Sequence, residues 1–238
     1  MTEHLYQLDS YVREFNSVIT AADGQLVALD RTAFYPGGGG QPGDVGMLTW
    51  DGGSAQVVKV KRQGANLWHA LDGEPPAQGA VVRGVLDWDH RYRLMRTHTA
   101  LHVLCGVVWR DYGASVTGGN MEPLKGRMDF EFETMRKELV AEIEASVNAE
   151  IEKDHDVRTA ILPREEAFQI PDLIRTKINL LPPQIQEVRT VEIVGLDLQA
   201  DGGTHVANTS EVGPVRVVDY KSKGAINKRI YIELETEA

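Results

Sequence analysis

Arg96-Thr97-His98-Thr99-Ala100-Leu101-His102 is the stretch of this sequence that decides the fold around it. Its two histidines are four residues apart, so on a helix both project from the same face, one turn above the other. An apolar stripe that includes Met95, Cys105 and Trp109 keeps the same helical phase. The stretch therefore predicts an amphipathic helix with both imidazoles on its inward face, ending at Gly113.

A buried imidazole is costly without a partner, so the two histidines are either core residues with hydrogen-bond partners or metal ligands. A second cluster, Asp201-Gly202-Gly203-Thr204-His205, favours ligands. Asp201 and His205 are again four residues apart. The two glycines between them are typical of a turn or loop, so this pair is expected outside a helix. The complete set of nitrogen and oxygen donors, which suits zinc, is His98, His102, Asp201 and His205.

A metallopeptidase of the HExxH type is the obvious competitor for a helical histidine pair. In that class the residue after the first histidine is a glutamate that serves as general base. Here that position is Thr99. The sequence therefore excludes this peptidase class.

Several longer motifs accompany the histidines: FYPGGGGQPGD at Phe34–Asp44, DHRYRLMRTHTALH at Asp89–His102, GGTHV at Gly202–Val206 and KSKGAINKRI at Lys221–Ile230. In this order they resemble the editing domain shared by alanyl-tRNA synthetase and the free-standing AlaX editing proteins, in their medium-length form. That family carries HxxxH and then CxxxH, and this chain has Asp201 where the cysteine stands. The resemblance covers nearly the whole chain.

The resemblance implies a zinc-dependent aminoacyl-tRNA hydrolase that acts in trans. Its expected substrate is mischarged Ser-tRNA(Ala), with Gly-tRNA(Ala) as a second one. The glycine-rich loop is expected to reach over the editing site, with Gln41 and Thr32 as substrate contacts. Lys223 and Arg229 are candidate RNA contacts. The residues alone instead favour a long mobile connection for the loop, and Thr32 could equally be a strand or turn hydroxyl.

Asp201 leaves two questions open. A carboxylate is a legitimate zinc ligand, but it is harder than a thiolate and donates less charge. Asp201 is either such a ligand or a base for the attacking water. The alternative at the level of function is a metal-free module that binds the tRNA end without hydrolysing it.

Bulk properties fit a folded, cytoplasmic protein. The chain has 238 residues, of which 42% are hydrophobic and 25% charged, and a single cysteine, which excludes an internal disulfide. We expect neither a secretory leader nor a membrane span. The net charge of -10 argues against broad nucleic-acid binding. Basic residues are nevertheless grouped, and two converging groups would form a phosphate-binding rim: Lys59, Lys61 and Arg62; His90, Arg91, Arg93 and Arg96; Lys221, Lys223, Lys228 and Arg229.

Two domains are expected. Residues 1–87 read as six or so short strands with tight turns, which predicts a small barrel, and the resemblance implies a translation-protein-like barrel in the same place. Residues 88–238 predict an α+β domain in which helices pack on one mostly antiparallel sheet, and the resemblance implies the second additional domain of threonyl- and alanyl-tRNA synthetases. In that domain we expect a turn at residues 118–120, a helix capped by Thr134, and short helical pieces at residues 164–168 and 171–176. The sequence does not predict an oligomeric state.

Overall fold

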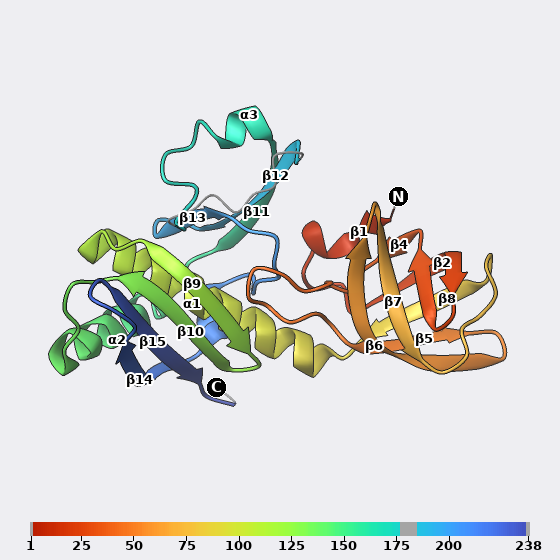
Figure 1. Cartoon of the computed structure of the whole chain (residues 1–238), viewed down its shortest axis with the longest axis horizontal. Coiled ribbons are helices and arrows are strands. Elements are labelled where there is room, and N and C mark those ends of the chain that lie inside the picture. The colour runs from red at the N-terminus through yellow and green to blue at the C-terminus, as the bar shows by residue number, and fades with distance from the viewer. Residues whose placement is uncertain (1, 177–184, 237–238) are drawn as a thin grey trace. The chain divides into compact units, whose positions relative to one another are not determined.

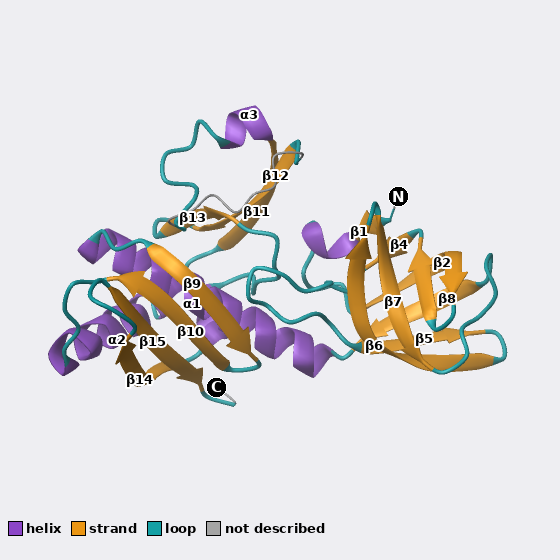
Figure 2. Ribbon diagram, in the orientation of Figure 1, coloured by secondary structure: helices purple, strands orange, loops and turns teal. Residues whose placement is uncertain are grey.

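The computed structural model describes residues 2–176 and 185–236 and forms two compact units, Met1–Arg93 and Leu94–Ala238 (Figure 1). The first unit is built from strands and the second combines helices with sheets (Figure 2). Helix α1 (Trp88–Tyr112) begins in the first unit and continues into the second. The predicted α+β class with an N-terminal barrel is confirmed. No helix in the described ranges is long and apolar enough to span a membrane.

The predicted barrel is present and closed, with strand order β2-β3-β7-β6-β5-β8. Its strands are β2 (Glu14–Asp23), β3 (Leu26–Leu29), β5 (Gly46–Trp50), β6 (Gly53–Gln63), β7 (Asn66–Asp72) and β8 (Val81–Leu86). A short parallel pair, β1 (Glu3–His4) with β4 (Arg31–Thr32), and a 3-10 turn at Leu5–Gln7 complete the unit. Antiparallel pairing throughout the barrel agrees with the tight turns in the sequence.

Apolar side chains fill the interior of the barrel, because every second side chain of a strand points inward. In β2, for example, Phe15 and Ile19 are buried while their neighbours are exposed. The Phe15 ring meets the edge of Phe34 at 5.8 Å between centroids. It also lies over Gly84, where a Cβ atom would be 2.5 Å from the ring. Gly84 is therefore required by close packing rather than by a turn.

The second unit is organised around α1, which ends where the sequence predicts, at Gly113 with φ of +63°. A four-stranded antiparallel sheet in the order β14-β15-β10-β9 packs against it, with Leu101 of α1 against Gly126. Its strands are β9 (Val116–Glu122), β10 (Lys125–Glu131), β14 (Val215–Ser222) and β15 (Asn227–Leu234). A second helix, α2 (Lys137–Ile151), runs beside β14 (Figure 1).

A separate three-stranded sheet carries the loop of the second ligand cluster. It consists of β11 (Val157–Pro163), β12 (Glu187–Ile193) and β13 (Asp197–Ala200), with α3 (Arg164–Ala167) after β11 and a 3-10 turn at Thr209–Val212. The prediction of one sheet is therefore wrong, because two independent antiparallel sheets form. Strand periodicity identifies strands but not their partners.

Three local predictions are also wrong. The expected turn at residues 118–120 lies inside β9, where Gly118 and Gly119 pair with Asp129 and Met128, and the chain turns at Leu124 instead. Helix α2 begins at Lys137 rather than after Thr134, and no side chain caps it. Residues 171–176 form a turn and irregular chain, not helix. Glycine-rich and proline-rich runs mark irregularity without fixing its form.

One buried carboxylate links α2 to the end of α1. Glu150 accepts from Arg110, from Lys153 at 2.8 Å and from His155 at 2.9 Å. Its side chain is 5% exposed. Burial raises the pKa of this carboxyl, but the hydrogen bonds from Lys153, Arg110 and His155 outweigh burial and lower the pKa to about 2.

Glu150→Gln is expected to lower the free energy of unfolding by about 2 kcal/mol at pH 7. The carboxylate stabilises the fold above its unfolded pKa, and this contribution is lost as the pH falls from about 4.5 toward 2. Urea unfolding of the variant and the unsubstituted chain should therefore converge in acid. Glu142→Gln, on the exposed side of the same helix, is the control and should follow the unsubstituted chain at every pH.

Candidate metal centre

The RTHTALH stretch holds the second unit together at several points of α1. Arg96 donates to the carbonyls of Val212 and Glu235, each at 2.9 Å. Thr97 accepts the Leu124 N–H at 2.8 Å, which fixes the turn between β9 and β10. The two polar residues that precede His98 are therefore fixed by contacts with backbone groups, which holds this part of α1 rigidly in the second unit.

Thr99 explains how the second ligand cluster reaches the helix. It is fully buried, and its hydroxyl accepts the backbone N–H of Val206 at 3.2 Å. His205, the residue before Val206, is thereby brought over the helical histidine pair. The position that would be the glutamate base of a peptidase is thus an anchor for the ligand loop, which agrees with the exclusion of that class.

Asp201 is oriented by its own loop. Its backbone N–H donates to the Arg189 carbonyl, and the Arg189 guanidinium donates back to the Asp201 carbonyl, both at 3.0 Å. One carboxylate oxygen, Oδ1, accepts the N–H of Gly203 at 2.6 Å. The turn predicted for this glycine pair is therefore stabilised by the aspartate itself, and Oδ2 remains directed at the histidines.

The four candidate ligands converge. One donor atom from each of His98, His102, Asp201 and His205 lies within 4.8 Å of all the others. Asp201 Oδ2 is 3.6 Å from His98 Nε2 and 3.9 Å from His102 Nε2, and Oδ1 is 3.9 Å from His205 Nε2. The histidines are 3–5% exposed. Residues about a hundred positions apart in the chain thus form one buried cluster.

The donor set fits a divalent metal in number, chemistry and spacing. Ligand atoms about 2.0–2.2 Å from a tetrahedral zinc ion lie roughly 3.3–3.5 Å from one another. The measured separations of 3.6–3.9 Å are slightly wider, so a small inward movement of the side chains would complete such a site. Without a cation, three stacked or edge-on imidazoles at centroid distances of 4.2–5.1 Å would be an unusual core.

Protonation within the cluster is uneven. Burial lowers the pKa of His98 to about 4 and holds the pKa of His205 well below its usual range. Burial also lowers the pKa of His102, but the carboxylates of Asp197 and Asp201 outweigh it and raise this pKa to about 9. Burial raises the pKa of Asp201, yet the three imidazoles hold it well below its ordinary value. Asp201 is therefore an anion, and two of the histidines are neutral, as ligation requires.

One residue of this region, Asp197, is not among the site residues predicted from the sequence. It lies on β13, and its carboxylate is 3.6 Å from the outer ring nitrogen of His102. A signal for it exists in the sequence, because Asp197, Gln199 and Asp201 alternate and so share one face of a strand. That signal does not show which helix the face meets.

Thr32 and Gln41 both lie in the first unit and both are buried. Thr32 Oγ1 accepts the N–H of Phe34 at 3.1 Å and is 2.9 Å from His69 Nε2. Because His69 Nδ1 faces the carbonyl of Val27 at 3.3 Å, Nδ1 carries the ring proton, and the Thr32 hydroxyl donates to Nε2. The structure gives the units separately, so convergence of these residues on the metal cluster stays a prediction.

The glycine-rich loop is an ordered, hydrogen-bonded turn rather than a long mobile connection. Gly37 to Gly40 all have positive φ, between +59° and +142°, which side-chain-bearing residues rarely adopt. Gly38 and Gln41 exchange backbone hydrogen bonds at 3.0 and 2.9 Å, and the Tyr35 hydroxyl donates to the Gly38 carbonyl. Four consecutive glycines are therefore needed by the backbone conformation.

The predicted basic groups are largely used within the fold. Arg91, Arg96 and Lys228 are each at most 5% exposed. Lys228 donates to two carbonyls of its own hairpin loop, at Gly224 and Ala225. The prediction that these three residues belong to a phosphate-binding rim is wrong, because their charges are neutralised or hydrogen-bonded internally.

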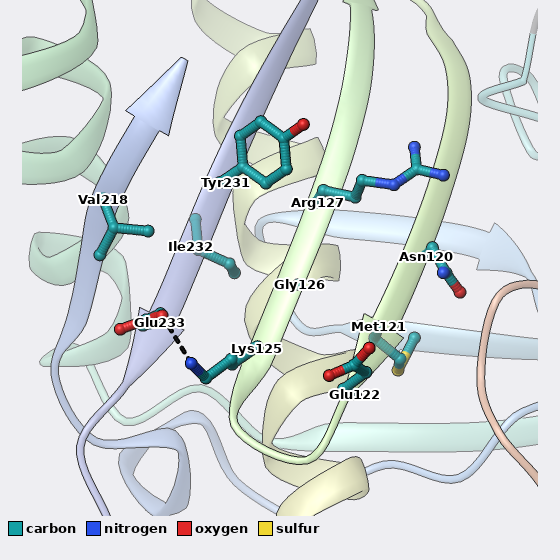
Figure 3. A pocket seen from close by; sticks show the side chains of 10 residues that line it. All are labelled: Asn120, Met121, Glu122, Lys125, Gly126, Arg127, Val218, Tyr231, Ile232 and Glu233. Atoms are coloured by element: carbon teal, nitrogen blue, oxygen red, sulfur yellow. Dashed lines mark ion pairs between the residues drawn. The ribbon is translucent and has the colours of Figure 1, made fainter. Parts of the chain in front are cut away.

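The two candidate RNA contacts lie at or near the hairpin between β14 and β15. Lys223 is exposed, whereas Arg229 pairs with Asp129 through two contacts at 2.6 and 2.7 Å. On the same outer face of the sheet is a hollow of about 220 Å³, beside Tyr231 and Arg127 (Figure 3). Its charges balance, since Lys125 pairs with Glu233 at 2.9 Å. RNA contact by Lys223 and Arg229 stays a prediction.

Comparison with known proteins agrees with this architecture. Residues 4–90 match the family described as tRNA synthetases class II (A), and residues 188–231 match the threonyl and alanyl tRNA synthetase second additional domain. The chain is 38% identical over 224 residues to the alanine–tRNA ligase of Pyrobaculum arsenaticum, covering 91% of this chain and 25% of that protein.

Two shorter relatives align along their whole length. The alanyl-tRNA editing protein AlaX-M of Saccharolobus solfataricus is 42% identical over 235 residues, which cover 97% of this chain and 98% of that protein. The AlaX-M protein of Methanosarcina acetivorans is 40% identical, with 98% and 99% covered. With this identity over the barrel, the histidine helix and the ligand loop, the chain belongs to the AlaX-M family of alanyl-tRNA editing proteins.

Proposed function

We propose that this protein is a trans-editing deacylase that hydrolyses the ester of mischarged Ser-tRNA(Ala), with Gly-tRNA(Ala) as a second substrate, at a zinc site. The observation that carries the proposal is the convergence of three buried imidazoles and a carboxylate on one point. Family membership supports the tRNA substrate, since the relatives are named for alanyl-tRNA editing.

His98, His102, Asp201 and His205 would hold the ion. When bound, zinc supplies Lewis-acid polarisation of the ester carbonyl and a fixed point for the substrate. The chain itself supplies a rigid frame, because Thr99 and the helix backbone fix the imidazoles before substrate arrives. An aminoacyl ester is already activated, so positioning contributes a large share of what hydrolysis needs.

Serine can be selected over alanine by a hydrogen bond. A site built to pair a substrate hydroxyl rejects the analogue that lacks it, because alanine leaves a buried polar group unpaired. Thr32 has the hydrogen-bonding pattern that such selection needs, because its proton is held by His69 and one lone pair by Phe34. The second lone pair of the Thr32 oxygen can then accept a hydrogen bond from the hydroxyl group of a serine substrate.

The experiment that tests the function is deacylation of Ser-tRNA(Ala) and Ala-tRNA(Ala), with and without a strong chelator. We expect rapid loss of serine, slow loss of alanine, inactivation by the chelator and recovery with zinc. RNA binding without turnover by zinc-supplied protein would instead favour the metal-free module. Turnover that is indifferent to the chelator would contradict the metal assignment.

Thr32→Val is expected to lower kcat/KM for Ser-tRNA(Ala) about 10- to 100-fold and leave slow Ala-tRNA(Ala) hydrolysis unchanged. Thr32→Ser, which keeps the hydroxyl, should restore discrimination. Because valine also leaves His69 Nε2 unpaired, the melting temperature is measured in parallel. Thr49→Val, on another barrel strand, is the control. An unchanged serine-to-alanine ratio in Thr32→Val would show that Thr32 does not sense the hydroxyl.

Asp201→Cys separates ligand from base. Thiolate is the softer zinc ligand, so if Asp201 coordinates, zinc binding should tighten about tenfold or more while deacylation persists. If Asp201 is instead the base, zinc content should remain and deacylation should be lost. Zinc content by mass spectrometry and the deacylation rate, measured on the same preparation, decide between the two. Separations of 3.6–3.9 Å from three ring nitrogens support the ligand role.

A further inference from the structure

His102 presents two ring nitrogens to two different partners. Nε2 faces the ligand cluster, 3.9 Å from Asp201 Oδ2. Nδ1 faces away from it and is buried, and within the described part of the chain it has no hydrogen-bond partner. The carboxylate of Asp197 stands 3.6 Å from it, so a shift of well under 1 Å would close a hydrogen bond of about 2.9 Å.

Asp197 is held firmly where it lies. Its side chain is fully buried at the start of β13, paired in register with Ile193. Arg175 Nε approaches Oδ1 at 3.3 Å, and Gln199 donates to Oδ2. A buried carboxylate needs such partners. Two of them fix its orientation, and the oxygen that accepts from Gln199 also faces His102.

The helix is adapted to this close approach. Gly106 lies one turn after His102 on α1, and a Cβ atom there would be 2.9 Å from Leu196 and 3.0 Å from Asp197. Any larger residue at this position would push the strand and its carboxylate away from the histidine. The absence of a side chain at Gly106 thus permits the contact between Asp197 and His102.

We propose that Asp197 is the positioning residue for the zinc ligand His102: it accepts a hydrogen bond from Nδ1–H and so keeps the Nε2 lone pair directed at the other three ligands. Carboxylates that orient metal-bound imidazoles in this way fix the tautomer and raise the basicity of the ligand. This inference rests on the zinc site of the proposed function and extends it to a residue outside the four ligands.

The test measures zinc affinity rather than turnover. Chelator competition on the purified, zinc-stripped protein gives the dissociation constant for zinc. We expect Asp197→Ala to raise it about 10- to 100-fold. Asp197→Asn, which keeps the shape and an acceptor oxygen but loses the charge, should give a smaller rise. It also serves if the alanine variant fails to fold.

A matched control separates ligand positioning from general destabilisation. Glu150→Gln removes another buried carboxylate of the same unit, one whose partners are Arg110, Lys153 and His155. It should lower stability and leave the zinc dissociation constant unchanged. Proton NMR of the zinc-loaded protein gives a second readout, because the Nδ1–H proton of His102 should resonate far downfield when it is bonded to a carboxylate and move upfield in Asp197→Ala.

The outcomes distinguish the two proposals. Zinc affinity within twofold of the unsubstituted chain in the folded Asp197 variants, with the His102 Nδ1–H resonance unmoved, would overturn the positioning role alone. A chain that binds no zinc at all would overturn the metal site and this inference with it. Weakened zinc binding in the Asp197 variants but not in Glu150→Gln is the result we expect.

Discussion

His98→Ala is expected to abolish stoichiometric zinc binding and to reduce deacylation of Ser-tRNA(Ala) about a thousandfold or more. A metal contributes several kcal/mol of transition-state stabilisation, and 1.4 kcal/mol corresponds to a factor of ten in rate. The ring to be removed lies 3.6 Å from Asp201 and stacks on His205 at 4.2 Å between centroids. Its loss removes one of the four donors that enclose the ion, so the remaining three should bind zinc much more weakly.

The substitution is chosen because it spares the fold. His98 lies within α1, and alanine is the best helix former, so α1 should persist. Circular dichroism and the melting temperature verify this, and zinc content and deacylation rate are measured on the same sample. His155→Asn, a histidine that pairs with Glu150 instead, should retain both. Full zinc content in His98→Ala would remove His98 from the ligand set.

Asp44→Ala is expected to destabilise the first unit by about 3–5 kcal/mol, because it leaves the buried charge of Arg91 without a partner. Arg91 is fully buried, and its guanidinium contacts both carboxylate oxygens of Asp44. It also donates to the carbonyls of Ser10 at 2.8 Å and Ala33 at 2.6 Å. Arg91 thus joins the first turn of α1 to three segments of the barrel unit, at Ser10, Ala33 and Asp44.

A double variant tests whether the charge or the contact matters. If the penalty comes from an unpaired charge, Asp44→Leu combined with Arg91→Met should be less destabilised than Asp44→Ala alone. The half-exposed pair of Arg31 and Glu3 is the control, and Glu3→Ala should change the free energy of unfolding by less than about 1 kcal/mol. Urea unfolding followed by tryptophan fluorescence gives all the values. Equal losses in the single and double variants would refute the charge argument.

The same ion pair explains why two separate motifs occur together. Asp44 ends the FYPGGGGQPGD stretch and Arg91 opens the histidine helix. The local pattern groups Arg91 with the cations of a phosphate-binding rim, because it gives the residue type but not its partner 47 positions away. Arg96 and Lys228 were misplaced for the same reason. A basic side chain stabilises the fold in this way only where the tertiary structure places carbonyl groups or a carboxylate within hydrogen-bonding distance of it.

The periodicity of apolar residues and the spacing of motifs were sufficient to predict the elements that depend on residues close together in the sequence. The 3.6-residue stripe predicted α1 and Gly113 predicted its end, while short strand-like runs separated by tight turns predicted the six barrel strands. The i, i+4 spacing of His98 and His102 put both rings on one face, and the motif order gave the family. These features depend on neighbours a few residues apart, and the sequence states them directly.

Only the tertiary structure decided the pairings between distant segments. The division of the second unit into two sheets depends on which strand edges meet. The position of Asp201 and His205 over α1 depends on the Thr99 hydroxyl and the Val206 N–H. The place of Asp197 behind His102 depends on the space left by Gly106. Each of these features is a contact between residues about ninety or more positions apart, or depends on strand register. The free energy that selects them comes from packing and burial in the folded chain, which no local pattern encodes.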